Sequence, residues 1–260
     1  MVYRLKQTEK AAPLFAGWQE TMIWSCLQGV MGAVFVDSPN RPASAAALLG
    51  DFCFLAGEPN RELVWYGPKG RDFLIMVPGG RGWAELIERC HGLAAKKVVR
   101  YAFKKEPGVF DRTRLQAAVD GLPKGYDLQR MDETLFWRCK EIKWCRDWVS
   151  QYENYSMYQR YGLGAVILED GDPVSGASSY SGYRGGIEIE IDTREDHRRR
   201  GLAFVCGAKL ILDCLARDWY PGWDAQNPWS AALAGKLGYH LESEYEAYEV
   251  IRNEQMSDRH

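Results

Sequence analysis

The sequence predicts an α/β (α+β) protein in which a mixed, mostly antiparallel sheet is flanked by helices. Three observations carry this prediction. The chain has 260 residues, which is enough for one large domain or two modest ones. In the first half, short apolar runs bounded by turn residues alternate with helix-like segments. In the second half, three closely spaced strand candidates lead into one long apolar helix, which is typical of a mixed α/β sheet.

Residues 1–122 are expected to form an N-terminal accessory α/β domain. A helix with Pro13 in its opening turn is predicted over residues 10–28. The β-like runs that follow lie at residues 33–36, 52–56, 63–66, 73–77 and 98–103. Further helices are predicted at residues 83–90 and 112–119. The polar segment 122–125 then predicts a domain boundary.

Residues 123–260 are expected to form the second domain. A strand is predicted at residues 126–130 or 135–138, and a helical region rich in aromatic residues at 143–161. The later strands are predicted at residues 164–169, 173–180, 186–193, 220–224 and 244–251. Helices are predicted at residues 201–217 and 228–237.

Composition and charge bear on partners and location. The net charge of −2 and the pI of about 6.1 give the chain no attraction to nucleic acid or to an anionic membrane. We find no run of the ~18 apolar residues that a membrane helix needs and no apolar signal-peptide core near Met1. We therefore expect a cytoplasmic protein with neither nucleic acid nor membrane as partner.

The seven cysteines and four histidines show no spacing of a zinc site, since none of the cysteines forms a CxxC pair. We therefore expect no metal, and interpret most of the cysteines as small core residues. The ten tryptophans and fourteen tyrosines suit either core packing or a wall that stacks against a ligand.

The segment 186–193 alternates isoleucine with acidic residues. As a strand, it would place Ile187, Ile189 and Ile191 on one face and carboxylates on the other. Those carboxylates are Glu188, Glu190 and Asp192. They form either a solvated face or the floor of a cleft, where mutual repulsion and partial burial would raise one pKa toward that of a general base.

Next comes a candidate anion site at residues 194–203. A strand, a turn with small residues and a helix start leave backbone amides free for an anion, and three consecutive arginines add positive charge. The same arginines could be a solvated charge run or a weak nucleic-acid patch. The following helix is apolar except for a narrow stripe of Lys209, Asp213 and Arg217, so we expect it to be covered on most sides.

These motifs resemble those of the GNAT acyltransferase superfamily. Arg198-x-x-Gly201-x-Ala203 resembles its (Gln/Arg)-x-x-Gly-x-(Gly/Ala) pyrophosphate loop. A second motif of the superfamily resembles Asn227-x-x-Ser230-x-x-Leu233-x-x-Lys236-Leu237-Gly238-Tyr239. With Trp223-Asp224-Ala225, the segment 188–248 looks most similar to the subgroup that includes zwittermicin A resistance acetyltransferases. The resemblance covers residues 126–251.

The resemblance implies an N-acetyltransferase that moves an acetyl group from acetyl-CoA directly to a primary amine of a small molecule. Strand carboxylates Glu188 and Glu190 would be the candidate bases. Because pantetheine would run back along the strand at roughly 3.3 Å per residue, Glu188 is favoured. The implied cofactor-binding residues are Ile191, Thr193, Arg198, Arg199, Arg200, Gly201, Leu202, Ala203, Asn227 and Ser230.

One position departs from the family pattern. Many members carry a tyrosine general acid seven residues after the asparagine, where this chain has Ala234. Ser230 or Tyr239 could protonate the leaving thiolate instead, or it could leave without help. The departure keeps two alternatives open: a non-catalytic acyl-CoA-binding sensor, and an aminoacyl or peptidyl transferase with paired acyltransferase-like domains.

The first half is expected to form one wall of the acceptor pocket and could be a degenerate copy of the same fold. Its Gly79-Gly80-Arg81-Gly82 segment has the shape of an anion loop, although a plain tight turn is the simpler interpretation. The sequence leaves the acceptor's identity and the oligomeric state open.

Overall fold

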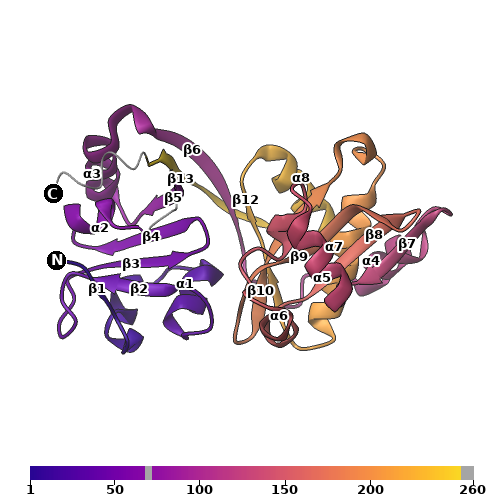
Figure 1. Cartoon of the computed structure of the whole chain (residues 1–260), viewed down its shortest axis with the longest axis horizontal. Coiled ribbons are helices and arrows are strands. Elements are labelled where there is room, and N and C mark those ends of the chain that lie inside the picture. Colours follow the sequence, from indigo (N-terminus) through magenta and orange to yellow (C-terminus); the bar gives the residue numbers. More distant parts are fainter. Residues whose placement is uncertain (68–71, 253–260) are drawn as a thin grey trace. The chain divides into compact units, whose positions relative to one another are not determined.

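The computed structural model describes residues 1–67 and 72–252, which form two compact units (Figure 1). Unit 1 contains Met1–Arg100 together with the C-terminal segment from Glu244, and unit 2 contains Tyr101–Ser243. This division differs from the boundary predicted after residue 122. The reason is that the helix around Leu115 packs on the long apolar helix of unit 2 and joins its hydrophobic core.

Unit 1 is built from short strands and short helices. In chain order they are β1 (Tyr3–Arg4), η1 (Thr8–Lys10), η2 (Ala12–Phe15), α1 (Thr21–Leu27), β2 (Ala33–Val36), β3 (Ser44–Leu49), β4 (Phe52–Gly57), α2 (Arg61–Trp65), β5 (Phe73–Pro78), α3 (Arg81–His91), η3 (Gly92–Ala94) and β6 (Ala95–Phe103). The last three residues of β6 already belong to unit 2.

Unit 2 holds the longer elements. They are α4 (Arg112–Asp120), β7 (Tyr126–Arg130), α5 (Glu133–Glu141), η4 (Arg146–Trp148), α6 (Tyr155–Tyr161), β8 (Gly164–Glu169), β9 (Asp172–Tyr183), β10 (Gly186–Thr193), η5 (Glu195–His197), α7 (Leu202–Leu215), β11 (Tyr220–Gly222), β12 (Asp224–Ala225), α8 (Pro228–Leu237) and β13 (Leu241–Ile251). From Glu244 onward, β13 belongs to unit 1.

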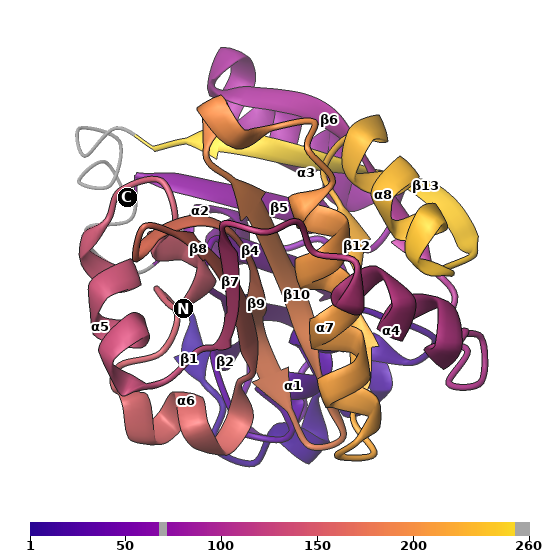
Figure 2. The same ribbon diagram turned by 90° about the vertical axis from the view of Figure 1, so that its right-hand side faces the viewer.

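The sheet of unit 2 is mixed, as predicted. Its strand order is β11-β10-β9-β8-β7, in which β7 to β10 are antiparallel neighbours and β11 runs parallel to β10. Figure 2 shows α7 and α4 on one side of this sheet and α5 and α6 on the other. The apolar α7 is therefore covered by the sheet and by α4, which explains why only a narrow polar stripe interrupts it.

That polar stripe ties α7 to the edge of the sheet. Asp213 is 7% exposed and accepts hydrogen bonds from Arg130 Nη2 at 2.7 Å and from Lys209 Nζ at 2.5 Å. Burial alone would raise the pKa of Asp213, but these two cations hold it below its usual range. The pair Arg130–Asp213 thus fixes β7 against α7.

Unit 1 repeats the element order of unit 2 on a smaller scale. Strands β1 to β4 are antiparallel neighbours, α2 follows, and β5 then runs parallel to β4 before α3 and β6. In unit 2 the same order is β7 to β10, α7, the parallel strand β11, α8 and β13. Strand β13 pairs antiparallel with β5 of unit 1. The chain is therefore built from two related arrangements of strands and helices.

Strands β1 and β3 of unit 1 were not predicted from the sequence, and two predicted elements differ from the structure. The helix predicted over residues 10–28 is split into η1, η2 and α1, because the backbone becomes extended at Ala16 and left-handed at Gly17 (φ 86°), while Pro13 lies in the first turn of η2. Residues 63–66 were predicted as a strand, but Leu63 lies in helix α2. There the Asn60 side chain accepts hydrogen bonds from the amides of Glu62 and Leu63, an N-cap that overrides the β-like composition.

Three predicted elements of unit 2 also shift. The alternative strand at residues 135–138 is wrong, since these residues lie in α5. The predicted helical region 143–161 resolves into η4 and α6 with irregular backbone between them. The strand predicted at 220–224 is divided into β11 and β12, because β12 leaves the sheet of unit 2 to pair with the end of β6.

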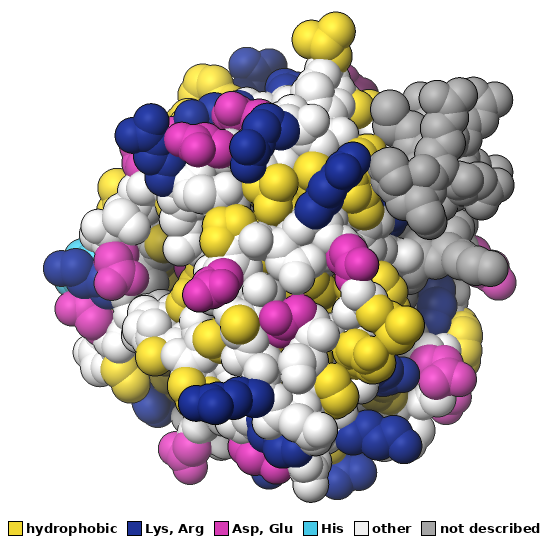
Figure 3. Space-filling model, turned by 90° about the vertical axis from the view of Figure 1, so that its left-hand side faces the viewer, with side chains coloured by type: hydrophobic (Ala, Val, Ile, Leu, Met, Phe, Trp, Pro, Cys, Tyr) yellow, Lys and Arg dark blue, Asp and Glu magenta, His cyan; other side chains and the backbone are white. Residues whose placement is uncertain are grey.

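The described residues can be compared with the composition in three respects: the cysteines, membrane-spanning helices and surface charge. All seven cysteines are free thiols; Cys90 is partly exposed and the other six are buried. No helix in residues 1–67 and 72–252 is long and apolar enough to cross a membrane. Figure 3 shows one face, on which Lys and Arg side chains are interspersed with Asp and Glu among apolar ones outside the grey atoms.

Candidate functional site

The parallel strands β10 and β11 form a fork. They pair over only three residues, and Glu188 opposite Gly222 is the last pair. Directly after Glu188 the register between β10 and β9 also shifts, because β9 has one extra residue between the partners of Glu188 and Ile189. The second half of β10 therefore continues beyond the end of β11.

The backbone beyond the fork offers hydrogen-bonding groups away from β9. Gly185 O accepts from Tyr220 N of β11, whereas Arg194 N donates to Val174 O of β9. Because backbone groups alternate sides along a strand, those of Ile191 and Thr193 point to the side from which β11 has diverged. These are the two residues predicted to bond the pantetheine arm. In this structure Thr193 N donates to Asp192 Oδ1 and Thr193 O accepts from Arg198 Nε.

The two faces of β10 are as predicted. Ile187 and Ile189 are buried in the core that contains α7, and Ile191 packs against it. The carboxylates lie on the other face, where Glu188 is only 4% exposed, Glu190 is half-buried and Asp192 is exposed. The acidic face is therefore not uniformly solvated, since its first carboxylate is buried at the fork.

Of the two causes predicted to raise a carboxyl pKa on this face, burial is the leading one at Asp192. The pKa of Asp192 is raised chiefly because the surrounding protein desolvates its carboxyl, although the side chain reaches solvent. Its neighbour Asp147 adds to the rise and Arg198 opposes it, so repulsion among the strand carboxylates is not the leading cause. Burial, with a smaller contribution from the negative charge of Glu188, raises the pKa of Tyr220 to about 12.

The loop between β10 and α7 exposes its backbone. Arg199 has a left-handed φ of 62° and Gly201, the N-cap of α7, has a φ of 81°. A Cβ placed on Gly201 would have no neighbouring atom within 4 Å, so the space beside this backbone is open. Gly201 has no side chain to cap the first amides of α7, which include those of Leu202 and Ala203. The loop thus has the form of a backbone anion site at the start of a fourteen-residue helix.

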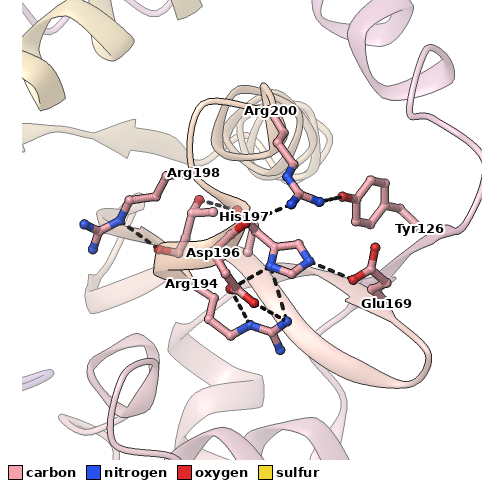
Figure 4. Close-up of polar contacts among 9 residues, drawn as sticks. Tyr126, Glu169, Arg194, Asp196, His197, Arg198 and Arg200 are labelled. Atoms are coloured by element: carbon pink, nitrogen blue, oxygen red, sulfur yellow. Dashed lines mark hydrogen bonds and ion pairs between the residues drawn. The ribbon is translucent and has the colours of Figure 1, made fainter.

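Two of the three consecutive arginines make specific hydrogen bonds with the surrounding protein. Arg198 Nε donates to Thr193 O at 3.3 Å, and Arg200 donates to Tyr126 Oη at 3.0 Å and to Asp196 O at 2.9 Å (Figure 4). Arg199 is exposed. The predicted cofactor residue Leu202 is 1% exposed in the core, so only its backbone amide can contribute to a site.

A buried histidine beside this loop was missed by the sequence analysis. His197 is 4% exposed, and its Nε2 lies 2.7 Å from Glu169 Oε2 while its Nδ1 lies 2.7 Å from Asp196 Oδ1 (Figure 4). Arg194 makes two further hydrogen bonds to the Asp196 carboxylate. The one signal in the sequence was a histidine directly before the arginines, and its partner Glu169 lies 28 residues earlier.

Two polar residues of the second predicted motif make hydrogen bonds at the start of helix α8. The Asn227 side chain is the N-cap of α8 and accepts from Ser230 N at 2.9 Å, while Ser230 Oγ accepts from Trp223 Nε1 at 3.2 Å. Because the parallel strands β10 and β11 both lead to helices at their carboxyl ends, the starts of α7 and α8 lie at the same edge of the sheet. Asn227 and Ser230 therefore flank the same end of the fork as the loop 198–201.

The position at which many family members carry a tyrosine lies in the packed core of this chain. Ala234 is fully buried in the hydrophobic core of unit 2. Tyr239, one proposed substitute acid, is 3% exposed and donates its hydroxyl to Pro221 O at 2.8 Å, and burial raises its pKa well above the usual value. Ser230 is the more accessible of the two proposed substitutes.

Unit 1 contains a cavity of about 470 Å³ at the end of β5. Gly80 and Arg81, from the segment considered as an anion loop, lie in its wall. Its lining is Trp18, Glu20, Val77, Pro78, Gly80, Arg81, Ala84, Glu85, Glu88, Lys97, Tyr245, Glu246 and Tyr248. Because glutamates outnumber the basic side chains in this lining, the cavity disfavours phosphate and suits a cation. Among the described residues, no group of three or more His, Cys, Asp or Glu is placed to hold a metal.

The family model for GNAT acetyltransferases matches residues 12–248, which is nearly the whole chain. The chain belongs to the GNAT acetyltransferase family. The match begins in unit 1, so both units belong to the region that defines this family.

Relatives of this GNAT chain agree with the assignment. It is 28% identical over 244 residues to the uncharacterized N-acetyltransferase YdfB of Bacillus subtilis (strain 168), covering 88% of this chain and 89% of the relative. A crystal structure of a GCN5-related N-acetyltransferase-like protein from Streptococcus suis 89/1591 is 46% identical, with a TM-score of 0.90, covering 94% of this chain and 98% of that chain.

A more distant structure bears on the paired units. A tandem GNAT protein from the clavulanic acid biosynthesis pathway is 13% identical, with a TM-score of 0.55, covering 96% of this chain and 98% of that chain. At this identity the likeness concerns the fold alone. It agrees with the repeated element order of the two units.

Proposed function

We propose that this GNAT protein is an acetyl-CoA-dependent N-acetyltransferase that acetylates a primary amine of a small molecule. The observation that carries the proposal is the fork of β10 and β11 followed by the open, left-handed loop at the start of α7. When bound there, acetyl-CoA would supply an activated acetyl thioester.

The chain's own residues fit this group. The backbone of Ile191 and Thr193 would bond the pantetheine arm, and the amides of residues 199–203 would hold the pyrophosphate, with charge from Arg198, Arg199 and Arg200. Asn227 and Ser230 would contact the cofactor arm from the start of α8. The fit rests on the open space at Gly201, which a Cβ would occupy.

A strand carboxylate would accept the proton from the attacking amine. Glu188 is the favoured base because it lies at the point of the fork, several residues before Thr193, and Glu190 is the second candidate. The leaving thiolate would be protonated by Ser230 or would leave without help, because Tyr239 is buried and Ala234 offers no acid.

Unit 1 would serve the acceptor rather than the cofactor. The cofactor signatures all lie after residue 186, and the unit 1 cavity combines glutamates with the rings of Trp18 and Tyr248. Carboxylates and aromatic faces together suit an amine-bearing cation. A non-catalytic acyl-CoA sensor and an aminoacyl or peptidyl transferase are disfavoured, because the family and the named relatives are acetyltransferases.

The test of the cofactor site is Gly201→Val. The new side chain would fill the open space beside the loop, so calorimetric affinity for acetyl-CoA should fall at least tenfold, or about 1.4 kcal/mol. Gly171→Val is the matched control, because Gly171 has a similar φ of 83° and an equally open Cβ position in the β8–β9 turn. An unchanged affinity in Gly201→Val, with normal circular dichroism, would exclude this loop as the site.

The acceptor is found by screening amines for release of free thiol from acetyl-CoA. Zwittermicin A belongs in the panel, because the segment around Trp223 and Asp224 resembles the subgroup of zwittermicin A resistance enzymes. A failure of every amine, in a protein that binds acetyl-CoA, would favour the sensor.

A further inference from the structure

Trp229 is the most exposed tryptophan of the chain, with 83% of its surface open to solvent. All ten tryptophans lie in the described residues, and Trp137, at 44%, is the only other exposed one. Indole rings are among the largest apolar side chains and are mostly buried in folded proteins. An indole as open as that of Trp229 therefore adds little to the core and is available to a ligand.

The backbone that carries this ring is held firmly at the start of α8. Pro228 is the first residue of the helix, and the Asn227 side chain accepts a hydrogen bond from Ser230 N at 2.9 Å. Ser230 Oγ in turn accepts from Nε1 of Trp223, which is 2% exposed in the core. Trp229 thus lies between two anchored residues, so its backbone needs no ordering when a ligand binds.

The ring extends toward the edge of the sheet that carries the proposed cofactor loop. Cα–Cβ bonds in a helix tilt toward its N-terminus, so a side chain in the first turn reaches over the start of the helix. The starts of α7 and α8 share this edge, and the two helices are in contact (Figure 2): a Cβ on Gly207 of α7 would lie 2.8 Å from Leu237 Cδ1 of α8. The Trp229 ring therefore borders the same edge as loop 198–201.

The part of acetyl-CoA that suits this ring is the adenine base. The proposed site assigns the pantetheine arm to β10 and the pyrophosphate to loop 198–201, and it leaves the base without a residue. Packed helices lie about 8–10 Å apart, a distance that a ribose and a base can span from the loop. Residues 225–235 contain no charged side chain, so this segment suits a neutral ring better than the 3′-phosphate of the cofactor. Aromatic side chains bind bases by stacking, because every base has a flat π-face.

We propose that Trp229 binds the adenine base of acetyl-CoA by stacking at the start of α8, while loop 198–201 holds the pyrophosphate. This inference rests on the proposed function of the loop. It makes Trp229 a specificity-determining residue, because the site then discriminates acetyl-CoA from donors that carry the same thioester without the adenosine. Stacking of one base on an aromatic side chain corresponds to about tenfold in affinity.

The test compares two donors by calorimetry: acetyl-CoA, and S-acetyl-4′-phosphopantetheine, which ends before the adenosine. Trp229→Ala should weaken acetyl-CoA binding about tenfold and change the affinity for the shorter donor by less than about twofold. Trp229→Phe keeps an aromatic face and should retain most of the acetyl-CoA affinity. Because Trp229 is exposed, neither variant should shift the thermal unfolding of the protein without ligand.

Trp137→Ala is the matched control. It removes the other exposed indole, which belongs to α5 on the opposite face of the sheet (Figure 2), and it should leave both affinities unchanged.

The outcomes are distinct. Wild-type affinity for acetyl-CoA in Trp229→Ala overturns the inference, and so does an equal loss for the two donors, which would mean that Trp229 supports the pantetheine arm and not the base. In both cases the proposed function stands, because Gly201→Val tests it separately. A wild type that does not bind acetyl-CoA overturns both.

Discussion

At the scale of single residues, the two glutamates of β10 differ in their surroundings although they share a face. Glu188 is buried at the last residue pair of the β10–β11 fork, and Glu190 lies opposite Ser178, two residues further along the open part of the strand. The proposed role of Glu188 as the base depends on its position at the fork, because a general base must lie within hydrogen-bond reach of the proton that it accepts.

We expect Glu188→Gln to lower kcat by about 10²–10⁴-fold, because a positioned base contributes that factor, while acetyl-CoA affinity stays unchanged. Glu190→Gln should have a much smaller effect. Asp192→Asn is the control, since the exposed Asp192 shares the acidic face but lies farthest from the fork. The readout is the pH dependence of turnover with the best acceptor. Equal, few-fold losses in Glu188→Gln and Asp192→Asn would mean that Glu188 is not the base.

Residue-level prediction from the sequence succeeded where the pattern is local. The alternation of Ile187, Ile189 and Ile191 with carboxylates determines which side chains face α7, and the structure confirms it. The burial of Glu188 and the two carboxylates around His197 could not be predicted. They depend on which strands become neighbours, and Glu169 and His197 meet only because β8 and the loop after β10 are brought together.

At the scale of elements, α8 shows how Ala234 is packed at the position where many family members carry a tyrosine. Ala234 is fully buried, and its carbonyl oxygen accepts from the amides of Gly238 and Tyr239 at the end of the helix. The core around it contains Leu237 and Tyr239. The slot that a tyrosine would need is therefore occupied by packed side chains.

Ala234→Tyr should destabilise the protein by about 1–3 kcal/mol, because it overpacks a filled core, and it should not raise turnover. Thermal unfolding followed by circular dichroism measures the first effect, and thiol release measures the second. Ala232→Tyr places the same side chain on an exposed position of α8 and should change stability by less than about 0.5 kcal/mol. Higher turnover with an unchanged melting temperature would mean that the slot is open after all.

Helix α8 was predicted from its end signals, whereas α2 and the division of β11 from β12 were not predicted. Helix α8 begins after Asn227 with Pro228 and ends before the left-handed Gly238, all of which are readable. The apolar run at residues 63–66 has the composition of a strand, and only the cap bonds of Asn60 make part of it helical. The separation of β12 from β11 depends on pairing with β6, which no local pattern contains.

At the scale of the whole molecule, the two units share an order of elements but differ where the cofactor would bind. In unit 2 the first antiparallel strands lead through the open loop 198–201 to α7, which has fourteen residues. In unit 1 the equivalent helix, α2, has five residues, and the Asn60 side chain already accepts from its first amides. The repeat could be suspected from the sequence, but the division at residue 100 and the entry of β13 into unit 1 could not, because β13 pairs with a strand about 170 residues earlier.

This difference predicts that the chain binds one acetyl-CoA, in unit 2. A pyrophosphate needs unsatisfied amides at a helix start, and in unit 1 the Asn60 cap uses those of Glu62 and Leu63 while the cavity near α3 is lined by glutamates. Native mass spectrometry and calorimetry of the full chain should both give a stoichiometry of one. Gly201→Val should remove that site, whereas Asn60→Ala should cost about 1 kcal/mol of stability and leave binding intact. A second equivalent of acetyl-CoA would contradict this prediction, and one equivalent retained at full affinity in Gly201→Val would exclude loop 198–201 as the site.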